Sequence, residues 1–227
     1  MNATLTAHSP VHHLVEALGP HWTRIGAMPT AAHFGSPQEE AAAVRTLGLC
    51  DLSALVKLGV KGPQADAWLA QQGVDVPGDI YETRRLSDGG LAVKIAADEY
   101  VLESGPACRT VPELLQKADD AALPAGVYRV EQQTATFLVG GTGALAAMAQ
   151  TCGVNLAEAV PERLIYSRVA GVSCAILPET LNAIGIYRLW VDYCDAIYLW
   201  QTLTQIIGEL GGRVVGAACL YPDLPVQ

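Results

Sequence analysis

Hydrophobic and polar positions along the chain predict a strand, a turn and a helix that occur twice. Residues 56–60 are mostly apolar, Gly62 and Pro63 follow, and an alanine-containing stretch ends at Gly73. Proline is favoured in the first turn of a helix and glycine just after its end, so we predict a strand at 56–60 and a helix at 63–72. The pattern returns at residues 135–156, where Gly141 stands 79 positions after Gly62. This repetition indicates an internal duplication.

The remaining segments fit one plan in both repeats. In the first repeat, alternation predicts short strands near 81–85, 91–95 and 100–102, and a helix opens at Val111 and Pro112. In the second repeat, residues 165–168 and 169–179 predict strands that precede a long helix. The expected core positions of that helix are Ala196, Trp200, Leu203, Ile207 and Leu210. We therefore predict an α+β fold of two duplicated ferredoxin-like βαββ(β)α halves packed together.

A capping box marks the expected start of the first half. Ser36 and Glu39 have the spacing at which the serine hydroxyl accepts the N–H of Glu39 and the glutamate side chain reaches back. We interpret Glu40, the next residue, as a solvated surface charge. The predicted organisation is an N-terminal arm at 1–35, a first half at 36–122, a second half at 127–218 and a tail at 219–227. Together the two halves would form one domain.

All five histidines lie in the predicted arm. His8 and His12 have the four-residue spacing that suits a divalent metal on a helix, but Pro10 lies between them and no acidic or cysteine ligand is near. We therefore predict no metal site and interpret the segment as a mobile or docking arm.

Charge and hydropathy narrow the class of partner. The net charge is −9 and the 14 Lys and Arg residues are scattered, which disfavours a nucleic-acid surface. No window holds the roughly 18 apolar residues needed for a membrane span. The first residues lack a cationic start and an apolar core, so we predict no secretory signal and a cytoplasmic location. The mean hydropathy of +0.26 suggests that some apolar surface faces another subunit.

Few residues are candidates for chemistry. The six cysteines form no C-x-x-C pair, so we expect six buried, unreactive thiols. The glycine-rich turn at 140–143 has two interpretations, a dinucleotide loop or close packing of a helix start; it lacks the third glycine and the later acidic residue of a dinucleotide motif. Asp51 and Asp192 follow or end apolar runs, where capping or turn bonding explains them better than acid–base chemistry. We predict no catalytic residue, because no Ser-His-Asp or Cys-His set can be assembled.

From residue 12 onward the chain resembles the folate-binding domain of the glycine-cleavage T-protein, the aminomethyltransferase. That family has a capped helix, a Gly-x-x-Asp-x-Ser turn and a strand-Gly-Pro-helix unit in this order. The matching positions are Gly48, Asp51, Ser53, Lys57, Gly62, Pro63 and Ala65. The likeness extends to about Gly216 and so covers nearly the whole chain.

The chain also departs from the T-protein pattern. A segment with the family's catalytic aspartate should follow Gly89 and Gly90, but the chain continues at once with Leu91. A Tyr-Thr-Gly-Glu segment, whose glutamate holds the pterin ring, should follow Arg168, but residues 169–174 read VAGVSC. The resemblance therefore implies loss of the acid and of the pterin contact, and the C-terminal barrel domain of the T-protein is absent from this sequence.

This shortened pattern resembles the gamma subunit of heterotetrameric sarcosine oxidase and the small subunit of N-methylglutamate dehydrogenase. The resemblance implies a noncatalytic subunit of a flavoprotein complex that oxidises N-methyl amino acids, with a structural and assembly role. Flavin would lie on larger partner subunits, and no cofactor is expected on this chain.

Two other functions stay open on the same resemblance. The chain could bind tetrahydrofolate in a cleft between the halves, with Tyr81, Tyr166 and Arg168 among the lining residues. It could also act as a folate-dependent repair or assembly factor, which would need an exposed reactive cysteine.

Overall fold

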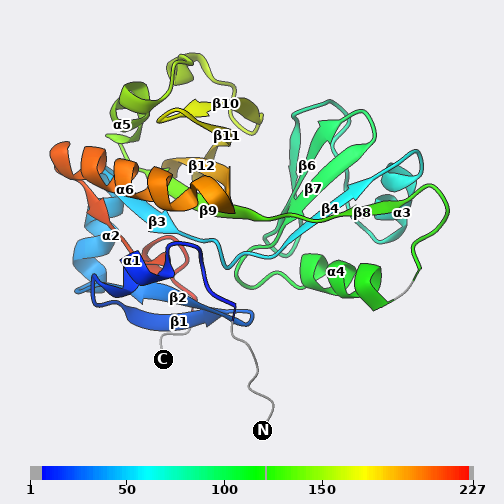
Figure 1. The fold of residues 1–227 in the computed structure, drawn as a ribbon, viewed down its shortest axis with the longest axis horizontal. Coiled ribbons are helices and arrows are strands. Elements are labelled where there is room, and N and C mark those ends of the chain that lie inside the picture. The colour runs from blue at the N-terminus through cyan, green and yellow to red at the C-terminus, as the bar shows by residue number, and fades with distance from the viewer. Residues whose placement is uncertain (1–6, 121, 225–227) are drawn as a thin grey trace, which may run out of the picture. The chain divides into compact units, whose positions relative to one another are not determined.

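The computed structural model describes residues 7–120 and 122–224, which form a mixed α+β structure (Figure 1). Two compact units are present: unit 1 comprises Met1–Ala54, Thr134–Pro161 and Ile165–Gln227, and unit 2 comprises Leu55–Gln133 and Glu162–Leu164. The helices are α1 (His12–Glu16), α2 (Pro37–Thr46), α3 (Ala65–Gln71), α4 (Thr110–Asp120), α5 (Ala144–Thr151), η1 (Leu156–Glu158), α6 (Tyr193–Glu209) and η2 (Ala217–Cys219). The strands are β1 (His21–Ile25), β2 (Met28–His33), β3 (Gly48–Asp51), β4 (Lys57–Lys61), β5 (Thr83–Arg85), β6 (Leu91–Ala96), β7 (Glu99–Glu103), β8 (Tyr128–Val130), β9 (Thr134–Gly140), β10 (Ile165–Val169), β11 (Val172–Leu181), β12 (Ile184–Asp192) and β13 (Arg213–Val214).

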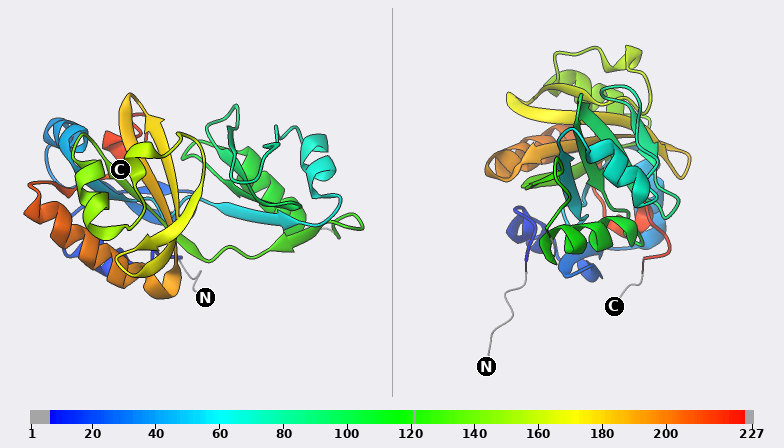
Figure 2. Two further views of the ribbon diagram at one scale, coloured as in Figure 1. Left: turned by 90° about the horizontal axis from the view of Figure 1, so that it is seen from above. Right: turned by 90° about the vertical axis from the view of Figure 1, so that its right-hand side faces the viewer.

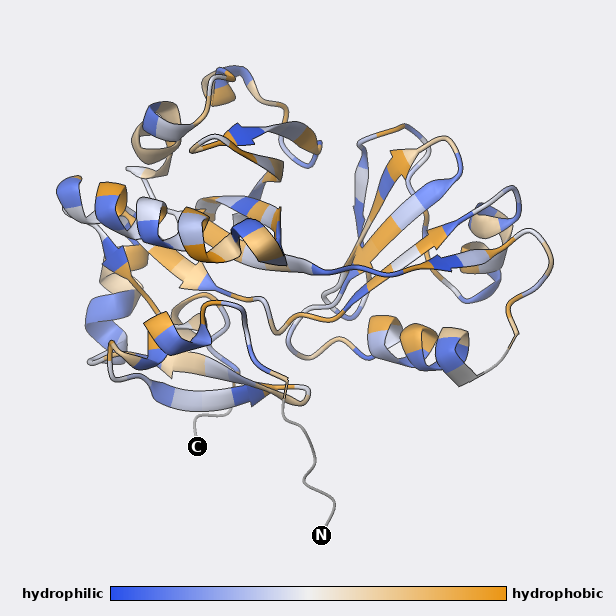
Figure 3. Cartoon of the chain, in the orientation of Figure 1, coloured by the Kyte–Doolittle hydropathy of each residue, from blue (hydrophilic) through white to orange (hydrophobic). Residues whose placement is uncertain are grey.

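Unit 2 is built on an antiparallel sheet with the strand order β5-β6-β7-β4-β8. Alternating apolar residues of the central strands meet α3 and α4 in one hydrophobic core that contains Val60, Trp68, Leu102 and Leu114. Figure 3 shows apolar residues running along the strands and alternating with polar residues along α4. The helices thus bury the face of the sheet that the alternation predicts.

Unit 1 is built on a six-stranded sheet with the order β10-β11-β12-β9-β3-β13, in which only β13 runs parallel to its neighbour. One core on one face of this sheet includes Phe137 and Leu189 from the strands, Met148 from α5 and Trp200 from α6. The rings of Phe137 and Trp200 lie 5.1 Å apart, centroid to centroid. The amphipathic pattern of the long helix therefore predicted its packing correctly, except that Leu210 lies just past the helix and is 40% exposed.

The predicted halves and the compact units are divided differently. The strand β3, which precedes β4 in the chain, pairs with β9 in unit 1, while β8, which precedes β9, pairs with β4 in unit 2. The strands β9 and β4 thus each gain a second neighbour, which satisfies the backbone N–H and C=O groups on the edge that would otherwise be open. The local hydrophobic pattern does not indicate which strand β3 or β8 pairs with. The prediction therefore placed each of these two strands in the half that follows it in the chain.

The predicted sequence of strand, glycine and helix occurs in both units. Gly62 lies between β4 and α3 with a φ of +116°, and Gly141 lies between β9 and α5 with a φ of +103°. A Cβ atom on Gly62 would lie 2.4 Å from the carbonyl oxygen of Gly126, and one on Gly141 would lie 2.6 Å from the backbone of Thr46. Glycine is therefore required at both turns by conformation and by close backbone approach.

The N-terminal segment is folded over residues 7–35, contrary to the expected arm. The helix α1 places Val11 and Val15 in the core of unit 1, and β1 and β2 form an antiparallel hairpin. The chain does bend at Pro10 before α1 begins, as the proline predicted. Residues 1–6 lie outside the described residues, and a docking role of this segment stays a prediction.

The capping box forms only in part. The Ser36 hydroxyl accepts the N–H of Glu39 at 3.5 Å, as predicted. The side chain that reaches back is Glu40, not Glu39: its Oε1 accepts from the N–H groups of Phe34 and Gly35. Glu40 is 3% exposed, so its interpretation as a solvated charge was wrong. Buried carboxylates are tolerated where several N–H groups satisfy them.

Among residues 7–120 and 122–224, no helix is long and apolar enough to cross a membrane.

Candidate functional site

Tyr166 and Arg168, two of the three predicted lining residues, lie at alternate positions of β10 and therefore on the same face of the sheet. The strand β10 is an edge strand, joined to β11 by a two-residue turn at Ala170 and Gly171, both with positive φ. Such a turn fits the twist of the hairpin and fixes its register. The tyrosine is 54% exposed. The register thus presents both side chains outward at the sheet edge.

An open cavity at β10 measures about 580 Å³, a volume that suits a small ligand. Its lining consists of Gly153, Tyr166, Ser167, Arg168, Ser173 and Cys174. Arg168 is the single charged residue in this set. Burial raises the pKa of the Cys174 thiol to about 12, so the thiol is protonated at neutral pH. This lining offers one cation and several hydroxyl groups but no acid or base.

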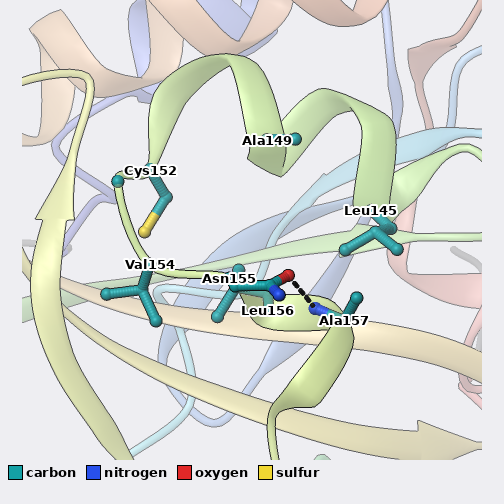
Figure 4. A pocket seen from close by; sticks show the side chains of 8 residues that line it. Leu145, Ala149, Cys152, Val154, Asn155, Leu156 and Ala157 are labelled. Atoms are coloured by element: carbon teal, nitrogen blue, oxygen red, sulfur yellow. Dashed lines mark hydrogen bonds between the residues drawn. The ribbon is translucent and has the colours of Figure 1, made fainter.

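A second cavity, of about 380 Å³, shares Gly153 with the first and lies between α5 and η1 (Figure 4). Its lining is mainly apolar: Leu145, Ala149, Cys152, Gly153, Val154, Asn155, Leu156 and Ala157. The Asn155 side chain accepts the N–H of Ala157 at 3.2 Å and donates to Glu158 at 2.8 Å. Its polar atoms therefore cap η1. This cavity can hold apolar groups but supplies no charge.

Tyr81 belongs to unit 2, whereas Tyr166 and Arg168 belong to unit 1. Tyr81 has a φ of +68°, its N–H donates to the carbonyl of Lys94 at 2.6 Å, and its carbonyl accepts from the N–H of Leu164 at 2.8 Å. Its side chain is 40% exposed. A single folate site formed by all three residues stays a prediction.

The cavities beside β10 and α5 do not fit tetrahydrofolate well. The N–H groups of a pterin ring need a carboxylate acceptor, and the two cavities that meet at Gly153 contain none. A third cavity, of about 240 Å³, includes Glu179, but the Arg188 guanidinium donates to that carboxylate at 2.7 Å and both side chains are almost completely buried. Arg168 could pair with a carboxylate of a ligand, but the lining offers nothing to hold the ring.

The glycine-rich turn at 140–143 is a packing element and not a phosphate loop. The N–H groups of Gly141, Thr142 and Gly143 donate to the carbonyls of Gly185, Arg45 and Thr46, respectively. The donors that would cradle a pyrophosphate are thus already used, and the helix start packs against the end of α2. The alternative of close packing is confirmed.

Asp51 serves a turn, as predicted. Its Oδ1 accepts from the N–H and the hydroxyl of Ser53, at 3.0 and 2.6 Å. The Ser53 hydroxyl oxygen in turn accepts from the N–H of Thr136. Asp192 occupies the N-cap position of α6 but makes no capping hydrogen bond with its side chain.

Asp88 is a carboxylate that sequence reasoning missed. It lies in the turn before β6, and its Oδ2 accepts from the N–H groups of Arg109 and Thr110 and from the Thr110 hydroxyl, while its Oδ1 accepts from the Cys108 thiol. Burial alone would raise the pKa of Asp88, but the hydrogen bonds from Thr110, Cys108 and Arg109 outweigh it and lower the pKa well below its usual range. The residue caps α4 from a distance of about 20 positions in sequence.

We expect Asp88→Asn to destabilise unit 2 by about 1–2 kcal/mol at neutral pH, because the amide loses charged acceptors at the start of α4. A folded pKa below the unfolded value gives stability that is present above about pH 4 and is lost as the pH falls further. Urea unfolding followed by circular dichroism should therefore show a difference at about pH 7 that shrinks near pH 3. Asp75→Asn, at an exposed loop position, is the control. A difference independent of pH would contradict this role.

The six cysteines are all free, and the expectation that all are buried is wrong for Cys194, which is exposed, and for Cys219, which is partly exposed. Cys194 lies in the first turn of α6 on the side away from the core. Burial raises the pKa of the Cys50, Cys108 and Cys219 thiols, to about 12 for Cys219. The Cys194 thiol is thus the one most accessible to solvent.

A thiol reagent added to the native protein should label one cysteine rapidly, at Cys194, since this thiol is the exposed one of the six. Mass spectrometry of the labelled peptides would identify the site, and Cys194→Ser should abolish the fast phase. Rapid native labelling at Cys152 or Cys174 would show instead that the cavities open to reagents.

Two buried ion pairs were also missed. Lys57 and Glu103 lie 3.3 Å apart in unit 2, and Arg188 and Glu179 form the pair described above in unit 1. A charged residue inside an apolar strand indicates from sequence that a buried charge is present, but it does not identify the residue of opposite charge that pairs with it. Among the described residues, no group of three or more His, Cys, Asp or Glu side chains could hold a metal ion.

No protein-family model matches this chain, and no curated protein matches it. Several solved structures share its fold, including the following two. Aminomethyltransferase T of the glycine cleavage system from Bartonella henselae has a TM-score of 0.78 with 16% sequence identity, over 95% of this chain and 61% of that chain. Heterotetrameric sarcosine oxidase from Corynebacterium sp. U-96, in complex with pyrrole 2-carboxylate, has a TM-score of 0.65 with 18% identity, over 92% of this chain and 98% of that chain.

These similarities establish the fold class: the chain has the α+β architecture found in both proteins. They are the two proteins that the sequence resemblance named, so that prediction is confirmed at the level of fold. This chain spans 61% of the length of the aminomethyltransferase but nearly the whole length of the matched sarcosine oxidase chain.

Proposed function

We propose that this chain is a noncatalytic, gamma-type subunit of a heteromeric flavoprotein oxidase or dehydrogenase that acts on N-methyl amino acids, with a structural and assembly role. The observation that carries the proposal is length: 92% of this chain aligns with 98% of a chain from a heterotetrameric enzyme. The two chains are therefore nearly equal in size. A protein of this size and fold already works inside a multi-subunit oxidase.

The chemistry of unit 1 supports a noncatalytic role. The cavities near β10 and α5 hold one exposed cation and a protonated thiol. The carboxylates of Asp51 and Glu40, and that of Asp88 in unit 2, are held by N–H and hydroxyl donors, so they maintain turns and helix ends. Flavin would then lie on larger partner subunits, as would the site that passes a one-carbon unit to tetrahydrofolate.

The duplicated architecture belongs to the same proposal. In unit 2 the sequence β4, α3, β6, β7, α4, β8 and the sheet order β6-β7-β4-β8 match a ferredoxin-like βαββαβ arrangement. In unit 1, β3 takes the place beside β9 that β8 takes beside β4. We infer that the two halves arose by duplication and exchange their preceding strands. Six free thiols fit the reducing cytoplasm, where we place the complex.

Affinity purification of the tagged full chain from its own cells tests the proposal. We expect larger subunits to copurify in fixed ratio, with a visible flavin spectrum and oxidation of sarcosine or another N-methyl amino acid. The isolated chain should show neither the spectrum nor the activity. Recovery of the chain alone, as a monomer without a flavoprotein, would contradict the proposal.

Tetrahydrofolate binding by this chain alone is testable separately. Calorimetric titration of the isolated protein with a reduced folate should give no heat of binding at millimolar ligand, since the two cavities that meet at Gly153 lack a carboxylate for the ring. Arg168→Ala and Tyr166→Phe serve as matched variants. Saturable binding that these variants weaken would revive the folate function.

A further inference from the structure

The solvent-facing side of α6 is uncharged over most of its length. The buried side of this helix carries Ala196, Leu199, Trp200, Leu203 and Ile207. On the opposite side the exposed residues before the last turn, which we call the α6 surface, are Tyr193, Cys194, Ile197, Tyr198, Gln201 and Gln205. Tyr198 is 54% exposed and Ile197 is 40% exposed.

This composition is unusual for a helix that faces water. Surface helices carry charged residues opposite their apolar face, whereas α6 contains no Lys or Arg and only Asp195 and Glu209 as charges. Protein interfaces are enriched in tyrosine and depleted of charge at their centre, with charged residues at the rim. The α6 surface has that composition.

The neighbouring helix extends the uncharged region. The helix α5 contains no charged residue, and α5 and α6 pack beside each other in unit 1, as Figure 2 also shows. Leu145 of α5 is 39% exposed, and Ala146, Ala149 and Gln150 are exposed as well. Apart from Asp195 and Glu209, these two adjacent helices of the same unit thus lack the charged residues that keep a free surface soluble.

We propose that the α6 surface is the site at which the larger oxidoreductase subunit docks. The inference rests on the proposed function and adds the contact and its chemistry. The charges carried by α6 and its N-cap residue are all acidic: Asp192, Asp195 and Glu209. Charge complementarity therefore calls for a partner patch with an apolar centre and a rim of lysine or arginine. A second copy of this chain would bring acidic groups against acidic groups, which disfavours self-association.

Matched substitutions test the contact. Tyr198→Glu places a charge at the centre of the α6 surface, and Tyr128→Glu places the same charge on β8 of unit 2, where the tyrosine is 57% exposed. Each tagged full-length variant would be used to capture the flavoprotein from the native cells, with flavin absorbance and peptide mass spectrometry identifying it. We expect Tyr198→Glu to reduce capture by about tenfold or more, as for a central interface residue, and Tyr128→Glu to leave it unchanged. A thermal unfolding midpoint equal to that of the wild type in both variants would show that folding is intact.

Charge reversal at the rim gives a second readout. Glu209→Lys should slow association at low salt, and the difference should vanish at high salt, because rim charges act mainly on the association rate. Faster association of Glu209→Lys would indicate an acidic partner rim and overturn the proposal.

The outcomes separate this inference from the proposed function. If the wild-type chain captures no flavoprotein, both fail. If capture succeeds and Tyr198→Glu retains it fully, the proposed function stands and the α6 surface is not the contact. If Tyr198→Glu instead dissolves a homodimer of the wild-type chain seen by light scattering, the occupant is a second copy and the docking proposal is wrong.

Discussion

Gly141→Ala should lower the free energy of unfolding of unit 1 by about 2–5 kcal/mol. The residue has a φ of +103°, which an alanine rarely adopts, and its new Cβ would lie 2.6 Å from the backbone of Thr46 and from the carbonyl oxygen of Val44. Neither contact is with a flexible side chain, so α2 or the start of α5 would have to move. Denaturant unfolding followed by tryptophan fluorescence suits the measurement, because Trp22, Trp190 and Trp200 belong to unit 1.

Gly211→Ala separates conformational strain from steric clash. Gly211 also has a positive φ, +79°, but a Cβ there would meet nothing within 4 Å. We expect this variant to cost about 1–2 kcal/mol, the strain alone. Equal losses for the two variants would show that the close approach of α5 to the end of α2 is unimportant.

Glu40→Gln should destabilise unit 1 by about 2–4 kcal/mol. Oε1 of Glu40 accepts from the N–H groups of Phe34 and Gly35, at 2.5 and 3.0 Å, and Oε2 accepts from the N–H of Gly216 at 2.7 Å. A glutamine has one carbonyl oxygen, so its amide nitrogen would face at least one of these donors with its own hydrogens. The side chain links α2 to β2 and to the turn before η2, so the loss should loosen all three.

Glu39→Gln is the matched control at the adjacent position. Its side chain is 68% exposed and lies 3.9 Å from that of Arg213, so we expect a change within about 0.5 kcal/mol. Hydrogen exchange at the amides of Phe34, Gly35 and Gly216 would locate the effect of Glu40→Gln. Unchanged protection at these amides would mean that Glu40 does not hold them.

Local pattern predicted the elements of the fold better than their partners. Proline, glycine and apolar spacing located β4, α3, β9, α5 and α6 to within a few residues. The pairing of β3 with β9 depends on contacts between residues about 90 positions apart, such as Leu49 with Val139. The periodicity of apolar residues within a segment does not predict such distant contacts. The N-terminal hairpin was missed because its two strands are short and β2 contains Pro29.

The candidate site could be predicted only in part. Tyr166 and Arg168 share a face because a strand alternates, and that much follows from sequence. The role of Glu40 could not be foreseen, since one of its partners, Gly216, lies 176 positions away. Asp88 was missed for the same reason: its donors at Arg109 and Thr110 come close only after β6 and β7 have formed.

Native mass spectrometry of the complex purified from the source cells tests the central claim most directly. The account predicts a particle that contains this 23.9 kDa chain together with larger, flavin-containing subunits in fixed ratio. Dissociation should release this chain without flavin or folate. A chain that occurs by itself, or that leaves the complex carrying the flavin, would contradict the proposal of a noncatalytic subunit.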